Sequence, residues 1–386
     1  MRARRVLTRL TALAVLLAVS VPVDDSGLSE RAATAEATPP ENASGVQAGL
    51  RQPGQFSAAD DAMSRPDCPP AVALRREPPA SRREYLDERR RELRGIADKL
   101  SASRDPEHLL AAAILGTDKG TSDRIDALAV ALDADPGRQL PLTHLFGACT
   151  GRPSAPVCAH HDIEKMLLQA GDSNGAHWAH IALYREAQGD LAEALEALAA
   201  ANSASGYDNH WIESVMMLER SLAASTSYTY TERVAEAFGI AAAELLLEGE
   251  VLGACTRHAS GSLEWRRICL SFGGMLEQKG VTVLGQAIGL GLQIKMLEIS
   301  DSDASIAAAK QRQAQFRREL YDEMLTEGAT FLMEHDANAL SDYLSVFEVY
   351  GENSALQFAR SEAERLKAVP GYEPCRRQVP GTLSDD

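Results

Sequence analysis

Six cysteines are the residues whose spacing most directly indicates a chemistry, and they stand at positions 68, 149, 158, 255, 269 and 375. An even number of cysteines is typical of disulfide pairing in a chain that leaves the reducing cytosol. Cys149 and Cys158 enclose a Pro- and Gly-containing loop, TGRPSAPV, and Cys255 and Cys269 enclose a second break. A disulfide can close such loops, so we predict the pairs Cys149–Cys158 and Cys255–Cys269. Elimination leaves Cys68 and Cys375 as a third pair.

Metal binding is the alternative chemistry for part of this set. His144, Cys149, Cys158, His160 and His161 lie close together in the sequence, and thiolates with imidazoles are typical zinc ligands. The spacing fits no ordinary zinc finger, because there is no C-x-x-C and the last two histidines are adjacent. Adjacent side chains on a helix point about 100° apart, which hinders joint ligation. An oxidising compartment would also consume the thiols, so we favour the disulfides and predict no bound metal.

Nothing in the sequence indicates a catalytic site strongly enough to predict an enzyme. Neither H-E-x-x-H nor a P-loop is present, and no nucleophile elbow is predicted. Cys255 and His258 would place a thiol beside an imidazole, but a disulfide explains the cysteine equally well. The glycines of VLGQAIGLGLQI do not have dinucleotide-loop spacing, and Gly285 and Gly289 are better explained by close helix packing. We therefore predict no catalysis and no cofactor.

The N-terminus has the pattern of an export signal. Arg2–Arg9 is basic, and the apolar run Leu10–Val23 follows it. This run suits the core of a signal peptide and is shorter than the roughly 20 residues that span a bilayer. Ala18-Val19-Ser20 is a usable cleavage site, so residues 1–23 are predicted to be a signal peptide or an uncleaved anchor. Either interpretation places the protein in the periplasm or cell envelope.

The charge balance restricts the partners of the remaining chain. The formal net charge is −16 over 386 residues, and the first 23 residues hold four arginines and no acid. Such an acidic chain repels nucleic acid and anionic lipid surfaces. We expect no nucleic-acid partner, and membrane contact only through an uncleaved N-terminal segment. Solubility alone also explains the acidity.

Composition divides the rest of the chain into a linker, a helical body and a tail. Residues 24–80 are rich in Ala, Pro, Ser and Gly and lack periodicity, which predicts a mostly disordered linker. Residues 81–369 form the predicted helical body, which opens with a capping box at Ser81–Glu84. Residues 370–386 are the tail. Helical periodicity throughout the body predicts an all-α fold.

The periodicity also predicts the individual helices of the body. The expected ranges are 81–100, 106–115, 122–132, 163–170, 176–187, 191–202, 209–224, 232–255, 261–278, 281–299, 303–334, 338–350 and 354–369. Two of them, 232–255 and 303–334, are long and uninterrupted.

One helical hairpin, at about 175–205, carries the most specific pattern. Trp178, Ile181 and Ala182 lie on its first helix, Gly189-Asp190 forms the turn, and small and apolar residues repeat along the second helix. The segment resembles a tetratricopeptide (TPR) or Sel1-like repeat unit. The resemblance is strict over about 30 residues and looser over 160–225. It implies antiparallel hairpins stacked as a TPR-like solenoid or an irregular helical array.

The resemblance also implies a function, since such repeats build binding surfaces for proteins and peptides. The leading hypothesis is therefore an exported helical scaffold that binds a protein or peptide in the cell envelope. A structural or stress-related envelope protein without a groove ligand is the second hypothesis. An enzyme or metal-binding protein that uses the His144–His161 cluster is the third. Trp178 is expected to pack between helices, whereas Tyr207 and Trp211 are the aromatic residues expected to be exposed.

Overall fold

The computed structural model describes residues 82–118, 121–160, 162–244, 247–300 and 303–370, and this part of the chain is all-α. No strand occurs among the described residues, which contain only two isolated β-bridges. The elements are α2 (Arg82–Ser101), α3 (Pro106–Gly116), α4 (Ser122–Ala134), α5 (Gln139–Thr150), α6 (Pro156–His160), α7 (Ile163–Gly171), α8 (Gly175–Gln188), α9 (Leu191–Ser203), α10 (Trp211–Ser225), α11 (Tyr230–Glu244), α12 (Leu247–Ala259), α13 (Leu263–Lys279), α14 (Val283–Ile299), α15 (Asp303–Arg318), the π-helix η1 (Glu319–Met324), α16 (Glu327–His335), α17 (Ala337–Tyr350) and α18 (Glu352–Lys367).

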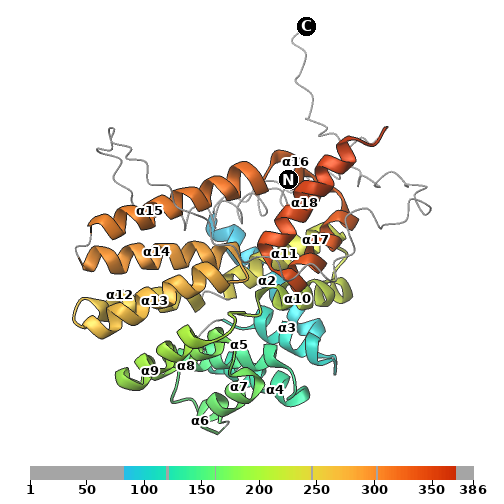
Figure 1. The fold of residues 1–386 in the computed structure, drawn as a ribbon. Helices are drawn as coiled ribbons and strands as arrows, with labels where there is room; N and C mark the ends of the chain where they lie inside the picture. The colour runs from blue at the N-terminus through green and yellow to red at the C-terminus, as the bar shows by residue number, and fades with distance from the viewer. Residues whose placement is uncertain (1–81, 119–120, 161, 245–246, 301–302, 371–386) are drawn as a thin grey trace.

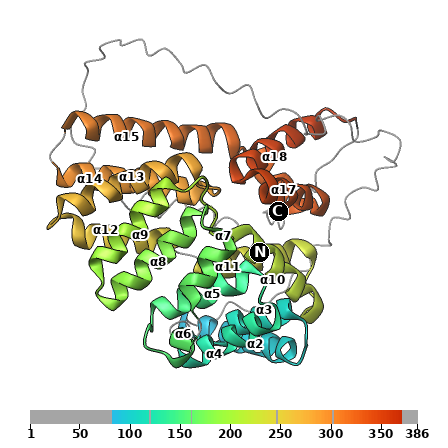
Figure 2. The ribbon, with the colours of Figure 1, turned by 60° about the horizontal axis from the view of Figure 1, so that its bottom comes forward.

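One half of the molecule is a stack of helices in successive layers. The hairpin α8–α9 contacts the hairpin α12–α13, with α8 against α12 and α9 against α13. Helix α14 packs on α12 and α13, and α15 covers α14 as the outermost layer (Figure 1 and Figure 2). On the other side of α8 lie α5 and α7. The stack therefore has the layered packing of antiparallel helices that the fold class predicts.

The order of the layers differs from the order of the chain. Helices α10 and α11 follow α9 in sequence, yet they pair with each other and pack on α2, α3 and α17 in the other half of the molecule. The chain then returns with α12 and α13 to cover the α8–α9 hairpin (Figure 2). The array is thus irregular, because an entire hairpin is inserted between two hairpins that touch.

The α8–α9 hairpin forms at the residues that the sequence indicated. The side chain of Asn174 caps α8 by accepting the Ala176 N–H at 3.0 Å. Gly189 ends the helix in the left-handed region, φ 87°, where a residue without Cβ is least strained. The second helix turns Ala194 and Leu198 inward, and both are almost completely buried. Capping, turn and apolar face agree here, which is why this hairpin could be predicted locally.

Helices α13 and α14 meet at two glycines that allow their backbones to touch. A Cβ on Gly273 would lie 2.7 Å from the carbonyl oxygen of Gly289, and a Cβ on Gly289 would lie 2.6 Å from that of Gly273. The predicted close packing of Gly289 is therefore confirmed. A Cβ on Gly285, its predicted companion, would lie 3.0 Å from the Thr282 hydroxyl and 3.8 Å from the Glu248 carboxylate of α12, so this glycine also faces a neighbouring helix.

Two predicted helix ranges were wrong, and the buried helix α5 was missed. The expected helix 232–255 is divided, since α11 ends at Glu244 and α12 begins at Leu247. The expected helix 303–334 becomes α15, η1 and α16, because Thr326 caps a new helix by accepting the Ala329 N–H. Helix α5 was not predicted, although it is largely buried. In each case the apolar pattern was present, but caps and packing decided where helices end.

Several predictions concern residues outside the described part. These are the signal peptide or anchor at 1–23, the linker at 24–80, the tail beyond residue 370, and the third cysteine pair at Cys68 and Cys375. Within the described residues, no helix combines the length and apolar character needed to cross a membrane.

Candidate functional site

Both predicted cysteine pairs lie at disulfide distance, and each joins two consecutive helices. Cys149 at the end of α5 is paired with Cys158 in α6, with Cα atoms 5.7 Å apart. Cys255 in α12 is paired with Cys269 in α13, with Cα atoms 5.8 Å apart. All four are buried. These bonds close the two breaks that the sequence analysis identified.

Three residues of the alternative metal cluster have other partners in the structure. Cys149 and Cys158 are joined to each other, and the Nε2 atom of His144 lies 3.2 Å from the Ser214 hydroxyl. The side chains of His160 and His161 lie outside the described part. Among described side chains, no three His, Cys, Asp or Glu residues gather in a way that could hold a metal ion.

The candidate thiol–imidazole pair is also divided between other partners. His258 contacts the Glu186 carboxylate at 3.0 Å, while Cys255 is in a disulfide.

An open hollow of about 520 Å³ lies on the surface between α7 and α8. We call it the Trp178 hollow; it is lined by Asp162, Glu164, Lys165, Leu168, Gln169, Asp172 and Trp178. The Trp178 indole is partly exposed, and its Nε1–H donates to the backbone oxygen of Asp172 at 2.7 Å. This bond holds the ring against the hollow. Acidic side chains outnumber the single lysine, so the hollow combines an aromatic ring with negative charge.

The expected roles of the aromatic residues were partly wrong. Trp178 packs against the core, as predicted, but also borders this hollow. Tyr207 is buried, not exposed, and its ring meets Phe272 edge-on at 6.0 Å. Trp211 is partly buried, with Phe238 at 4.9 Å. Both residues follow polar turn residues in the sequence, which is why their local context suggested exposure.

A buried polar cluster, which the sequence analysis did not predict, lies where α5, α8, α10 and α12 meet the connection 204–210. We call it the histidine junction; its buried members are His144, His177, His180, Tyr207, Asn209, His210, Ser214 and Glu248. A connection inside a protein needs internal partners for its peptide groups. Asn174 supplies two of them: its amide nitrogen donates to the Asp208 carbonyl at 2.8 Å, and its amide oxygen accepts the Asp208 N–H at 3.0 Å.

Two histidines of the junction contact each other. The Nε2 atoms of His177 and His210 are 3.4 Å apart, and the Nδ1 atom of His177 lies 2.8 Å from the Gly171 carbonyl oxygen. The Nδ1 atom of His210 faces the Glu213 carboxylate at 3.3 Å. Among described residues His210 alone has a positive φ without being glycine, at 58°. Such strain is typical of positions that surrounding structure holds in place.

Burial perturbs the ionisable groups of the junction in different directions. Burial lowers the pKa of His180 to about 3, and the neighbouring histidines add to the effect. Burial also lowers the pKa of His177. Burial raises the pKa of Glu248 to about 7, although Asn209 donates to its carboxylate at 2.7 Å. Perturbed groups of this kind mark candidate functional sites, because catalytic and binding groups need pKa values that an ordinary surface does not provide.

The pentapeptide GDSNG at 171–175 matches the G-x-S-x-G pattern of hydrolase nucleophile elbows, although the sequence analysis predicted no such elbow. An elbow requires a strand before the serine and a helix after it. Here the segment connects α7 to α8, so the element directly before the serine is a helix. The two nitrogens of nearby His177 face Gly171 and His210, not Ser173. The geometry therefore does not form a Ser-His pair.

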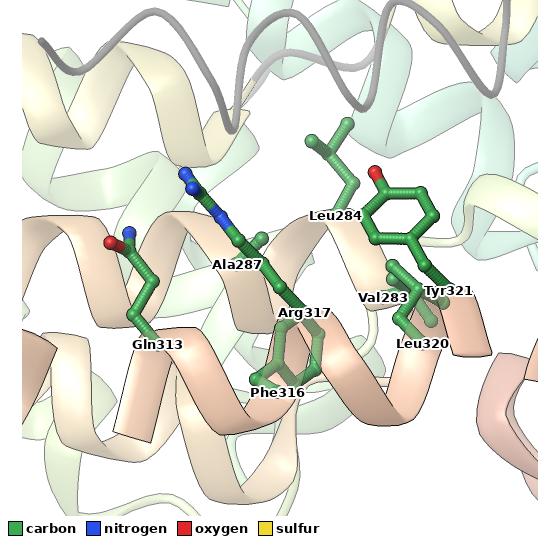
Figure 3. Close-up of a pocket in the computed structure, with 8 residues that line it drawn as sticks. All are labelled: Val283, Leu284, Ala287, Gln313, Phe316, Arg317, Leu320 and Tyr321. Carbon is green, nitrogen blue, oxygen red and sulfur yellow. The ribbon is translucent and has the colours of Figure 1, made fainter. Parts of the chain in front are cut away.

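A small apolar pocket lies between α14 and the α15–η1 segment (Figure 3). Val283, Leu284 and Ala287 line it from one side, and Phe316, Leu320 and Tyr321 from the other. Its volume of about 20 Å³ is close to the room of one water molecule. It is too small for an organic ligand.

Comparison with known proteins identifies no relative. No protein-family model matches the chain, and no curated protein or solved structure is significantly similar to it.

Proposed function

We propose that this protein is an exported helical scaffold that binds a peptide segment of another protein through the Trp178 hollow. The hollow is the observation that carries the proposal. It is open to solvent, it lies between α7 and the first helix of the TPR-like hairpin, and it presents a partly exposed indole beside Asp162 and Asp172. Buried disulfides at two helix junctions are compatible with export, as is the N-terminal pattern of the sequence.

The chemistry of the hollow favours a basic segment. An arginine or lysine can lie over the indole of Trp178, where the ring quadrupole attracts a cation. Asp162 and Asp172 are exposed at the rim and add charge complementarity. Glu164 is already engaged by Arg185 at 2.6 Å, which offsets most of its charge, so this carboxylate contributes little to the attraction of a cation. Leu168 offers apolar surface for the stem of a long cationic side chain.

Tryptophan fluorescence provides a direct test. The chain has three tryptophans, so replacing Trp211 and Trp265 by phenylalanine leaves Trp178 as the only emitter. We expect saturable, salt-sensitive quenching by the peptide GRLRG, and much weaker quenching by the same peptide with citrulline in place of arginine. The citrulline peptide isolates the charge because its shape is nearly the same.

Charge variants sharpen this experiment. Asp162→Asn and Asp172→Asn should each weaken peptide binding by up to about fivefold, the upper range for an exposed ion pair. Asp133→Asn, on the exposed surface of α4, is the matched control and should leave binding unchanged. Equal binding of both peptides, or no saturation by either, would contradict the proposal and favour a structural envelope protein without a groove ligand.

A further inference from the structure

His210 is held through both of its ring nitrogens. Its Nδ1 atom lies 3.3 Å from a carboxylate oxygen of Glu213, and its Nε2 atom lies 3.4 Å from Nε2 of His177. His177 in turn places Nδ1 2.8 Å from the carbonyl oxygen of Gly171. The three contacts form one continuous chain of hydrogen-bonding groups from α10 to the end of α7.

The partners at the two ends of this chain decide where the protons lie. A carbonyl oxygen only accepts, so Nδ1 of His177 carries a proton. When His177 is neutral, its Nε2 is an acceptor, and Nε2 of His210 must donate to it. Nδ1 of His210 faces a carboxylate and must donate as well. With both nitrogens as donors, His210 is an imidazolium, an assignment that follows from the hydrogen-bond network.

We propose that the His177–His210 pair is a pH-sensitive latch that fastens the connection 204–210 to the α7–α8 connection, closed at mildly acidic pH and released above neutrality. Loss of one proton from His210 leaves either two lone pairs facing each other or a lone pair facing Glu213. Either arrangement is repulsive in a buried site. The left-handed backbone of His210 then loses the contacts that offset its strain.

The groups around His210 favour the protonated, positively charged form of its ring. The charged and titratable groups around it are Asp208 in its own connection, Glu213 on α10, and His177 and His180 on α8, with His144 and Glu248 further along the junction on α5 and α12. Burial opposes the charge of His210, but the Glu213 hydrogen bond and the Asp208 charge outweigh it and raise its pKa. Burial lowers the pKa of His177, which keeps that ring an acceptor.

The direction of the pH effect follows from these shifts. A histidine whose pKa is raised on folding contributes stability below its unfolded value of about 6.5, and this contribution is lost as pH rises through the folded value. The latch is therefore closed on the acid side and opens on the alkaline side. It is independent of any ligand of the Trp178 hollow, although Asp172 and Trp178 adjoin the same α7–α8 connection.

Hydrogen exchange of the full chain tests the latch. The amides of Gly206, Asp208 and His210 are bonded within the junction. After correction for intrinsic exchange rates, we expect their protection to fall severalfold from pH 6 to pH 8, while amides in the middle of α9 change little. His210→Asn should remove most of this difference, because asparagine accepts the left-handed conformation but does not titrate. The remainder comes from Glu248, which accepts from Asn209 in the same connection. His108→Gln, on α3 and outside the junction, is the matched control and should leave the difference unchanged.

A second measurement does not depend on any variant. Nitrogen-15 NMR of histidine-labelled protein at pH 6 should show His210 protonated at both nitrogens and His177 protonated at Nδ1 alone. Protection that is equal at pH 6 and pH 8, a pH difference of unchanged size in His210→Asn, or a neutral His210 at pH 6 would each overturn the latch.

Discussion

The α13–α14 contact and the histidine junction are both buried joints between helices, but they are held together in different ways. At the first, Gly273 and Gly289 let two backbones touch, and the atoms nearest to the two glycines are backbone atoms and side-chain carbons. At the second, side chains such as His177, His210 and Glu248 carry the contact through hydrogen bonds. The first joint depends on shape, whereas the second depends on which groups carry protons.

This difference predicts how each joint responds to change. A shape-dependent joint is sensitive to a single added carbon atom and indifferent to pH, because close-packed interiors relax little. A proton-dependent joint tolerates neutral replacements of the right geometry and responds to pH. Substitutions in the stack and a pH titration of the junction therefore distinguish the two kinds of joint. We expect the largest change in unfolding free energy from a substitution in the stack and the smallest from titration of the junction.

The largest effect is expected where a charge enters the stack. Ala194 is completely buried on α9, so Ala194→Glu places a carboxylate where it has no partner. Overpacking and desolvation together should lower the unfolding free energy by about 3–5 kcal/mol. Glu193→Ala, one residue earlier on the exposed face, loses only a surface pair with Arg185 and should stay within about 0.5 kcal/mol. Thermal melts of the two variants measure the contrast, and equal melting temperatures would show that the hairpin does not pack as described.

The next largest loss of stability is expected when the disulfide between α12 and α13 is removed. Replacing Cys255 and Cys269 by alanine opens a loop closed at a sequence separation of 14, which should cost about 3 kcal/mol. The shorter loop of Cys149 and Cys158, with a separation of 9, should cost slightly less. Denaturant titrations of the two double variants give the values. Non-reducing peptide mapping that finds these four thiols free would contradict both disulfides.

The glycine contact tests the shape-dependent joint itself. In Gly289→Ala the new Cβ meets the Gly273 carbonyl oxygen at 2.6 Å, so the helices must separate. We expect a loss of about 1–3 kcal/mol that is the same at pH 6 and pH 8. Gly291→Ala is the matched control on the same helix, because its Cβ has nothing within 4 Å. It should be neutral or stabilising by up to about 1 kcal/mol, since alanine favours helix.

The smallest effect is the pH dependence of overall stability, to which Glu248 of the junction and Glu352 at the start of α18 both contribute. Burial raises the pKa of Glu248 to about 7, and desolvation of Glu352, which accepts the Val283 N–H, raises its pKa to about 7 as well. Their contributions, like that of His210, are present at low pH and are lost as pH rises through the folded values. Melting temperature should therefore fall between pH 6.5 and 8.

Two other groups act in the opposite direction. The pKa values of His177 and His180 are lowered, so below about pH 6.5 the unfolded chain binds protons that the folded chain does not. The stability that the two histidines lose on acidification offsets the stability that the two carboxylates gain. Melting temperature should therefore change little between about pH 4.5 and 6.5. Glu248→Gln keeps the acceptor for Asn209 and should reduce the decline above pH 6.5. A decline of unchanged size in this variant would show that Glu248 does not titrate there.

Local sequence determined the features that need only neighbours along the chain. Periodicity established the all-α class, the Gly189 turn with its flanking apolar faces placed the α8–α9 hairpin, and the short breaks between cysteines indicated both disulfides. Each of these depends on interactions over a few turns of helix or one short loop. The same local evidence could not divide 303–334, because an apolar stripe continues through a break that Thr326 caps.

Only the tertiary structure decided which helices touch and where the polar groups meet. The α10–α11 hairpin leaves the stack to pack on α2, α3 and α17, and the periodicity of its helices does not say so. His144, His177, His210 and Glu248 are dispersed along the sequence and each resembles an ordinary surface residue. Their burial and their shifted pKa values arise from contacts between distant segments. Proton-linked behaviour therefore belongs to the fold, since it depends on a desolvated environment that no single helix creates.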